Sequence, residues 1–221
     1  MSEEKKLSGE ESLQIITEMI QKAKTSIHER GTSAILWGTV TAIAGLLSFA
    51  QRYFNFTIGF DIWLLVIVAV IPQIFISIKE NKDRMFRSYE ERAIDAIWIV
   101  YGISIGCYIF YLNVVPAISA QFFAAEQGVV VDQLKNFPAY IYSAASVFLI
   151  LYAIPTLATG IISKFKPMLI GGIISYVLFI ISCYTYSTWD MFLLGIAGIL
   201  NWLIPGIILR NRYLKGKLAN V

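Results

Sequence analysis

The chain has 221 residues, of which 57% are hydrophobic and only 15% are charged. Soluble domains carry about 25% charged residues, so this composition excludes a soluble domain of this size, which needs a polar surface all round. The formal net charge of +3 is too small to indicate nucleic-acid binding, and we expect the lipid bilayer to be the main environment of the chain.

The first segment, residues 1–31, is polar and predicts a cytoplasmic or interfacial amphipathic helix. Ser8 and Glu11 form an S-x-x-E capping box, a typical start of a helix, and Gly31 is a natural end. Apolar residues then recur every three or four positions, which places them on one helix face. This face consists of Leu13, Ile16, Met19, Ile20, Ala23 and Ile27.

The apolar face of this helix has three candidate partners. It can lie on the inner leaflet, with Lys22 and Lys24 near anionic headgroups. It can pack against the cytoplasmic ends of the membrane spans. It can also dock a cytoplasmic protein or a second copy of the chain, and the pattern alone does not separate these alternatives.

Six further stretches contain no Asp, Glu, Lys, Arg or His and approach the roughly 20 apolar residues that cross a bilayer. They are Ser33–Phe49, Ile62–Ile78, Ala96–Val115, Ala139–Ile162, Met168–Tyr184 and Met191–Leu209. We therefore predict an all-α fold, a six-helix transmembrane bundle of three helical hairpins over residues 32–210. The longest external segment, Ser119–Pro138, is expected to be mostly a loop rather than a short helix.

Basic residues support this count of spans. Lys and Arg concentrate on the cytoplasmic side of membrane proteins, and 16 of the 18 basic residues fall in segments that six spans place on one side. Arg52 and Lys135 are the exceptions. Both termini are therefore predicted to be cytoplasmic, including the basic tail at 211–221.

The second span of each predicted hairpin carries a proline in its cytoplasmic half: Pro72, Pro155 and Pro205. Proline leaves the carbonyl four residues earlier without its helical donor. Polar side chains lie close by in the sequence: Gln73, Thr156 and Asn201. One interpretation is that they satisfy the freed carbonyls and join the helices, and the other is that they line a small polar cavity open to the cytoplasm.

Gly102 and Gly106 form a G-x-x-x-G motif in the third span, and Gly38 and Ala42 form its small-residue version in the first. Such motifs allow close approach of membrane helices. Packing within one chain and pairing of two chains explain them equally well.

The residues needed for catalysis are missing from the spans. The only histidine, His28, lies in the N-terminal segment, and His28-Glu29 lacks the second histidine of H-E-x-x-H. No span holds a buried acid or base of the kind that ion-coupled transporters use. We therefore expect no enzyme, no catalytic residue, no cofactor and no metal site.

The capped polar helix, Trp37-Gly38 at the start of the first span, and Leu203-Ile204-Pro205-Gly206 before the basic tail form a recurring pattern. The chain resembles, over most of its length, an uncharacterised family of bacterial multi-pass inner-membrane proteins of unknown function. The resemblance implies a bacterial source and an inner-membrane location, and it implies no activity.

Two functional hypotheses remain. The first is a non-enzymatic regulatory or scaffolding membrane protein, favoured by the missing chemistry and by the amphipathic face. The second is a small permease or channel-like protein for a neutral solute, favoured by the proline-broken spans with polar neighbours. A polar cavity reaching Gln73 and Asn201 would favour the second hypothesis.

Overall fold

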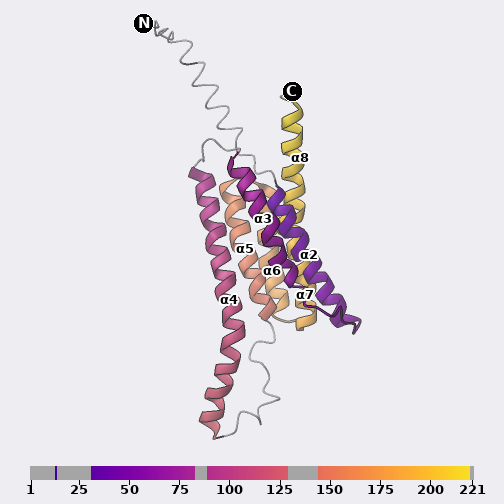
Figure 1. Cartoon of the computed structure of the whole chain (residues 1–221), viewed down its shortest axis with the longest axis vertical. Helices are drawn as coiled ribbons and strands as arrows, with labels where there is room; N and C mark the ends of the chain where they lie inside the picture. Colours follow the sequence, from indigo (N-terminus) through magenta and orange to yellow (C-terminus); the bar gives the residue numbers. More distant parts are fainter. Residues whose placement is uncertain (1–12, 14–30, 83–88, 129–143, 220–221) are drawn as a thin grey trace.

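The computed structural model describes Leu13 and residues 31–82, 89–128 and 144–219 (Figure 1). The predicted N-terminal amphipathic face lies outside these residues except for Leu13, which is helical and 65% exposed. Within the described residues every regular element is a helix. They are α2 (Thr32–Tyr53), α3 (Leu64–Lys82), α4 (Tyr89–Gln127), α5 (Ala144–Ile162), α6 (Lys166–Ser182), α7 (Ser187–Gly198), the π-helical turn η2 (Ile199–Leu203) and α8 (Ile204–Ala219).

Four helical stretches are long and apolar enough to cross a membrane, which confirms the prediction of an all-helical membrane protein at this level. They are Thr32–Tyr53, Tyr89–Val114, Ala145–Ile162 and Ser187–Gly216, the last running through α7, η2 and α8. The two remaining helices coincide with the second and fifth predicted spans. α3 has 19 residues and contains Pro72, and α6 has 17 residues.

One expectation about the segment after the third span is wrong over residues 119–127, and the rest of that segment, beyond residue 128, lies outside the described residues. The segment from Ser119 was expected to be mostly a loop, but α4 continues as a helix to Gln127. The extension Ala120–Gln127 is rich in alanine, glutamine and glutamate, which favour helix. It ends at Gly128, whose φ of 65° is the left-handed conformation that commonly terminates helices.

Among the described helices, the two most extensive contacts join helices from different predicted hairpins. α5 packs against α6, and α2 packs against α7, whereas among the described helices the backbone of α3 lies close only to α2 and that of α4 only to α5. The contact between α2 and α7 depends on small residues, because a Cβ atom at Gly45 would lie 2.6 Å from the backbone nitrogen of Gly195. The centre of the bundle is formed by buried side chains of α5, α7 and η2: Ala145, Leu149, Tyr152, Leu194, Ala197 and Trp202.

Contacts at both ends show that α2 runs antiparallel to the last helix. At one end the Arg210 guanidinium donates to Thr32 Oγ1 at 3.4 Å, and at the other the Arg52 guanidinium donates to Ser187 Oγ at 2.7 Å. The beginning of α2 and the end of α8 therefore lie at the same end of the bundle (top of Figure 1).

Candidate functional site

The three polar residues beside the prolines lie in different parts of the bundle. Gln73 fastens α3 to α2, because its Oε1 accepts a hydrogen bond from Trp37 Nε1 at 3.0 Å. Its Nε2 donates to Ser33 Oγ at 3.0 Å and to Ser77 Oγ at 3.1 Å. The amide is thus bonded through both its oxygen and its nitrogen, and Pro72 beside it is exposed.

Thr156 lies in the centre of the bundle and joins α5 to η2. Its side chain is fully buried. It accepts a hydrogen bond from Trp202 Nε1 at 3.0 Å and donates to the Tyr152 carbonyl one turn earlier at 2.7 Å. Tyr152 in turn forms a side-chain hydrogen bond with Thr41 of α2. Thr156 thus connects α5 to η2, and the side chain of Tyr152 separately connects α5 to α2.

Asn201 lies in η2 and is fully buried against α6. Its Nδ2 donates to Ser175 Oγ at 2.7 Å. Its Oδ1 has no hydrogen-bond partner and faces the α-carbon of Gly171, where an added Cβ would lie 2.9 Å away. Only a glycine at position 171 leaves room for the amide, and a weak Cα–H···O contact is the interaction that this approach offers.

The π turn explains how the helix passes Pro205. Pro205 has no N–H to donate to the Asn201 carbonyl. The Ile204 N–H instead donates to the Ile199 carbonyl, five residues earlier. The helix is therefore wider by one residue in the turn that precedes Pro205. Pro155 is also buried, but α5 continues through it as an α-helix.

An aromatic cluster surrounds Trp202 and was not anticipated from the sequence. The Trp202 ring lies 4.7 Å from Tyr152, 6.0 Å from Trp98 and 6.2 Å from Tyr101, measured between ring centroids. Trp98 and Tyr101 thereby link α4 to the core across α5. The signal in the sequence was a tryptophan in the middle of a span, away from the boundary where tryptophan is usual.

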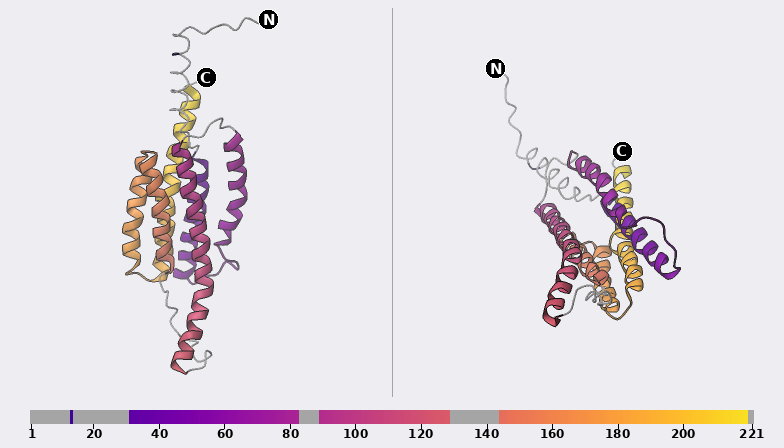
Figure 2. Two further views of the ribbon diagram at one scale, coloured as in Figure 1. Left: turned by 90° about the vertical axis from the view of Figure 1, so that its left-hand side faces the viewer. Right: turned by 60° about the horizontal axis from the view of Figure 1, so that its bottom comes forward.

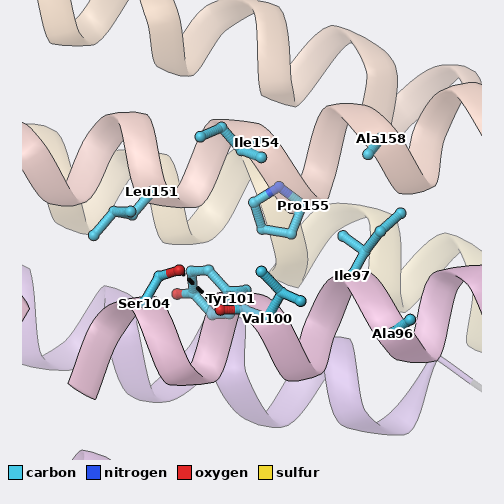
Figure 3. Close-up of a pocket in the computed structure, with 9 residues that line it drawn as sticks. All are labelled: Ala96, Ile97, Val100, Tyr101, Ser104, Leu151, Ile154, Pro155 and Ala158. Carbon is cyan, nitrogen blue, oxygen red and sulfur yellow. Dashed lines mark hydrogen bonds between the residues drawn. The ribbon is translucent and has the colours of Figure 1, made fainter. Parts of the chain in front are cut away.

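A cavity of about 310 Å³ lies between α4 and α5 (Figure 3). Its lining is almost entirely apolar and includes Pro155, Leu151 and Val100. Of its polar side chains, Ser104 donates back to the Val100 carbonyl at 2.8 Å, and Tyr101 faces the aromatic cluster. Gln73, Thr156 and Asn201 are not among its lining residues.

Two buried polar atoms of the described residues take no part in these hydrogen bonds. Thr159 Oγ1 and Asn201 Oδ1 have no hydrogen-bond partner, although both side chains are fully buried. Unsatisfied polar atoms cost free energy inside a protein. They are the places in the described core where a polar solute or a water molecule would find an acceptor.

In the described residues no group of three or more His, Cys, Asp and Glu side chains is placed to hold a metal ion. No protein-family model matches the chain, and neither a curated protein nor a solved structure does.

Proposed function

We propose that this chain is a non-enzymatic membrane protein with a regulatory or scaffolding role, which spans the bacterial inner membrane six times with both ends in the cytoplasm. The observation that carries the proposal is how the core uses its polar side chains. Gln73, Thr156 and Asn201 bond other helices, and the cavity between α4 and α5, which none of them lines, is apolar. A bundle of this kind is suited to holding a fixed shape rather than to passing a polar solute.

The six-span topology counts α3 and α6 as membrane spans in addition to the four long apolar stretches. The α6 helix is about 25 Å long at 1.5 Å per residue, and a bilayer with a roughly 30 Å hydrocarbon core accommodates such a helix by thinning locally. The start of α2 and the second half of α8 lie at the same end of the bundle. This arrangement agrees with an even number of membrane crossings. Basic residues at that end, such as Arg210 and Arg212, favour the cytoplasmic side.

The docking element in this proposal is the N-terminal apolar face, which begins at Leu13. We expect a photo-crosslinking amino acid at Met19 to give a discrete adduct with a cytoplasmic protein in living cells. The same residue at Gln21, which the sequence pattern places on the polar side of the predicted helix, serves as the matched control and should give none. Adducts of the same kind from both positions, or adducts with lipid alone, would contradict a docking role.

The buried side-chain oxygens of Thr159 and Asn201, which have no hydrogen-bond partner, favour a second candidate. This candidate is a small permease or channel-like protein for a neutral solute. In that case Thr159→Val and Asn201→Leu should each abolish solute flux into vesicles while the protein stays folded. Gln73→Leu is the control, because that amide lies at the α2–α3 contact. Flux that survives both core substitutions would remove this candidate.

A further inference from the structure

Three exposed basic side chains gather at one end of the bundle, around the turn that joins α5 to α6. Lys164 and Lys166 flank Phe165 in this turn, and both are exposed. The guanidinium carbon of Arg212, from α8, lies 5.2 Å from the centroid of the Phe165 ring. Figure 2 (left) shows the turn at the upper end of the bundle, where α8 rises past it. We call Lys164, Lys166 and Arg212 the basic corner.

The contact with Phe165 holds Arg212 in place without using its hydrogen-bond donors. A guanidinium over an aromatic ring is attracted by the face of the ring, and its N–H groups remain at its rim. Phe165 is buried, whereas the Arg212 side chain is exposed. The fork of N–H donors in arginine matches the geometry of a phosphate group, and lysine adds a compact positive charge. The basic corner therefore presents three cations that suit a phosphate.

The helices around the basic corner supply no acid that could neutralise it. Among the described helices, α6 and α8 lie close only to each other and to α2, α5, α7 and η2. The only acid in these six elements is Asp190, which lies in the first turn of α7 at the opposite end of the bundle. The first turn of α6 contains Lys166 and no acid, although acids are favoured and cations disfavoured at a helix N-terminus. The surrounding helices thus leave the charge of the basic corner uncompensated.

Other basic residues at this end of the bundle are mixed with acids. Glu80 lies between Lys79 and Lys82 at the end of α3, and Glu91 stands beside Arg92 near the start of α4. Positive charge is usual on the cytoplasmic side of membrane proteins, so the presence of cations does not by itself indicate a site. The lack of acids in the surrounding helices distinguishes the basic corner and indicates that an anion from outside the chain neutralises it.

The basic corner lies where the apolar parts of the helices end. α5 ends at Ile162 and α6 begins at Lys166, and the apolar run of α8 ends at Leu209, three residues before Arg212. In a membrane this boundary is the level of the lipid headgroups, and basic pockets between helices at this level bind anionic headgroups. The position of the basic corner therefore favours a lipid phosphate over a soluble anion.

The face of α6 that follows Lys166 suits an acyl chain. Ile170, Ile173 and Val177 are each about half exposed. Together with Lys166 they are spaced three or four residues apart, which places them on one side of the helix. A phospholipid has the same order of groups, a charged phosphate followed by hydrocarbon, whereas a soluble anion or an acidic peptide has no counterpart to this apolar stripe.

We propose that the basic corner is a binding site for an anionic phospholipid such as phosphatidylglycerol, with the phosphate at the three cations and an acyl chain along α6. The lipid belongs to the leaflet that faces this end of the bundle. The six-span topology of the proposed function makes this the inner leaflet, and the inference rests on the proposed function for that assignment only. A lipid bound here joins the α5–α6 turn to α8 and so stabilises the folded bundle.

Lipid binding to the purified protein in detergent tests the proposal, because the result does not depend on orientation in a membrane. Phosphatidylglycerol should raise the midpoint of thermal unfolding at concentrations about tenfold or more below those needed of phosphatidylcholine with the same acyl chains. Inorganic phosphate at the same concentrations should have little effect, because it lacks the acyl chains. Equal effects of the two lipids, or a phosphate effect as large as that of phosphatidylglycerol, would overturn the proposal.

Two triple variants with the same change of charge locate the site. The first replaces the basic corner: Lys164→Gln, Lys166→Gln and Arg212→Gln. It should lose the preference for phosphatidylglycerol. The control, Lys79→Gln with Lys82→Gln and Arg92→Gln, removes three cations from α3 and α4 at the same end of the bundle and should keep the preference. An undiminished preference in the first variant, or equal losses in the two, would contradict the assigned site.

A third variant separates loss of charge from loss of folding. It keeps every charge of the basic corner: Lys164→Arg, Lys166→Arg and Arg212→Lys. It should keep the preference for phosphatidylglycerol, and loss of the preference here as well would show that the glutamine variant acts through folding and would overturn the proposal. Failure of the topology is a separate result, because labelling of a cysteine at Asn211 from outside the cell would reverse the leaflet without removing the lipid preference.

Discussion

Replacing Gly45 with valine should lower the stability of the folded bundle by about 3 kcal/mol or more, because overpacking forces whole helices apart. A Cβ at position 45 would lie 2.6 Å from the Gly195 nitrogen and 2.8 Å from the Met191 carbonyl oxygen. Both are backbone atoms and cannot rotate away. The α2–α7 contact, one of the two most extensive between the described helices, would have to open.

Gly102→Val is the control for this experiment. It makes the same change of residue type in a membrane helix but meets nothing within 4 Å. Both variants should be unfolded by heating in dilute detergent, where separate copies do not meet, with tryptophan fluorescence as the readout. Equal losses of thermal stability in the two variants would show that the effect comes from helix propensity and not from the α2–α7 contact.

Trp202→Ala should have the second large effect, a loss of about 3 kcal/mol. Removing a buried tryptophan from a soluble core costs about 3–5 kcal/mol, and we expect the lower end because lipid tails are as apolar as the core. Trp202 is 3% exposed and stands among Tyr152, Trp98 and Tyr101. The substitution therefore leaves a cavity at the place where α4, α5 and η2 meet.

Two further variants divide this loss into packing and hydrogen bonding. Trp202→Phe keeps most of the ring but removes the bond to Thr156, and it should cost about 1 kcal/mol. Tyr184→Ala, at a residue that is 89% exposed, should change the midpoint of unfolding little. A Trp202→Ala variant as stable as Tyr184→Ala would contradict the assignment of Trp202 to the core.

The positions of the helices could be predicted from the sequence because they depend on local information. A run of about 20 apolar residues bounded by charges predicts a helix whatever surrounds it. The observed α2 begins one residue before its predicted start, and α5 ends at the predicted residue, Ile162. The extension of α4 was missed because its apolar and polar residues alternate without a clear boundary.

The packing of the helices could not be predicted in the same way. Pro72, Pro155 and Pro205 are alike in sequence, yet Pro72 is exposed and the other two are buried. Which neighbour covers a helix face depends on residues far away in the chain, as in the bond between Trp202 and Thr156. The loss of a donor at Pro205 was foreseeable, but neither the π turn that precedes it nor the packing of Asn201 against Gly171 and Ser175 of α6 was.

Thiol labelling in intact cells tests the central claim most directly: six crossings around a core without a water-filled path. In a chain without Cys107 and Cys183, we would place single cysteines at Thr57, Asn211 and Asn201. An impermeant reagent should label Thr57→Cys from outside and Asn211→Cys only after the membrane is opened, and Asn201→Cys should resist a small water-borne reagent from either side. Labelling of Asn211→Cys from outside would contradict the even number of crossings, and ready labelling of Asn201→Cys would contradict the dry core.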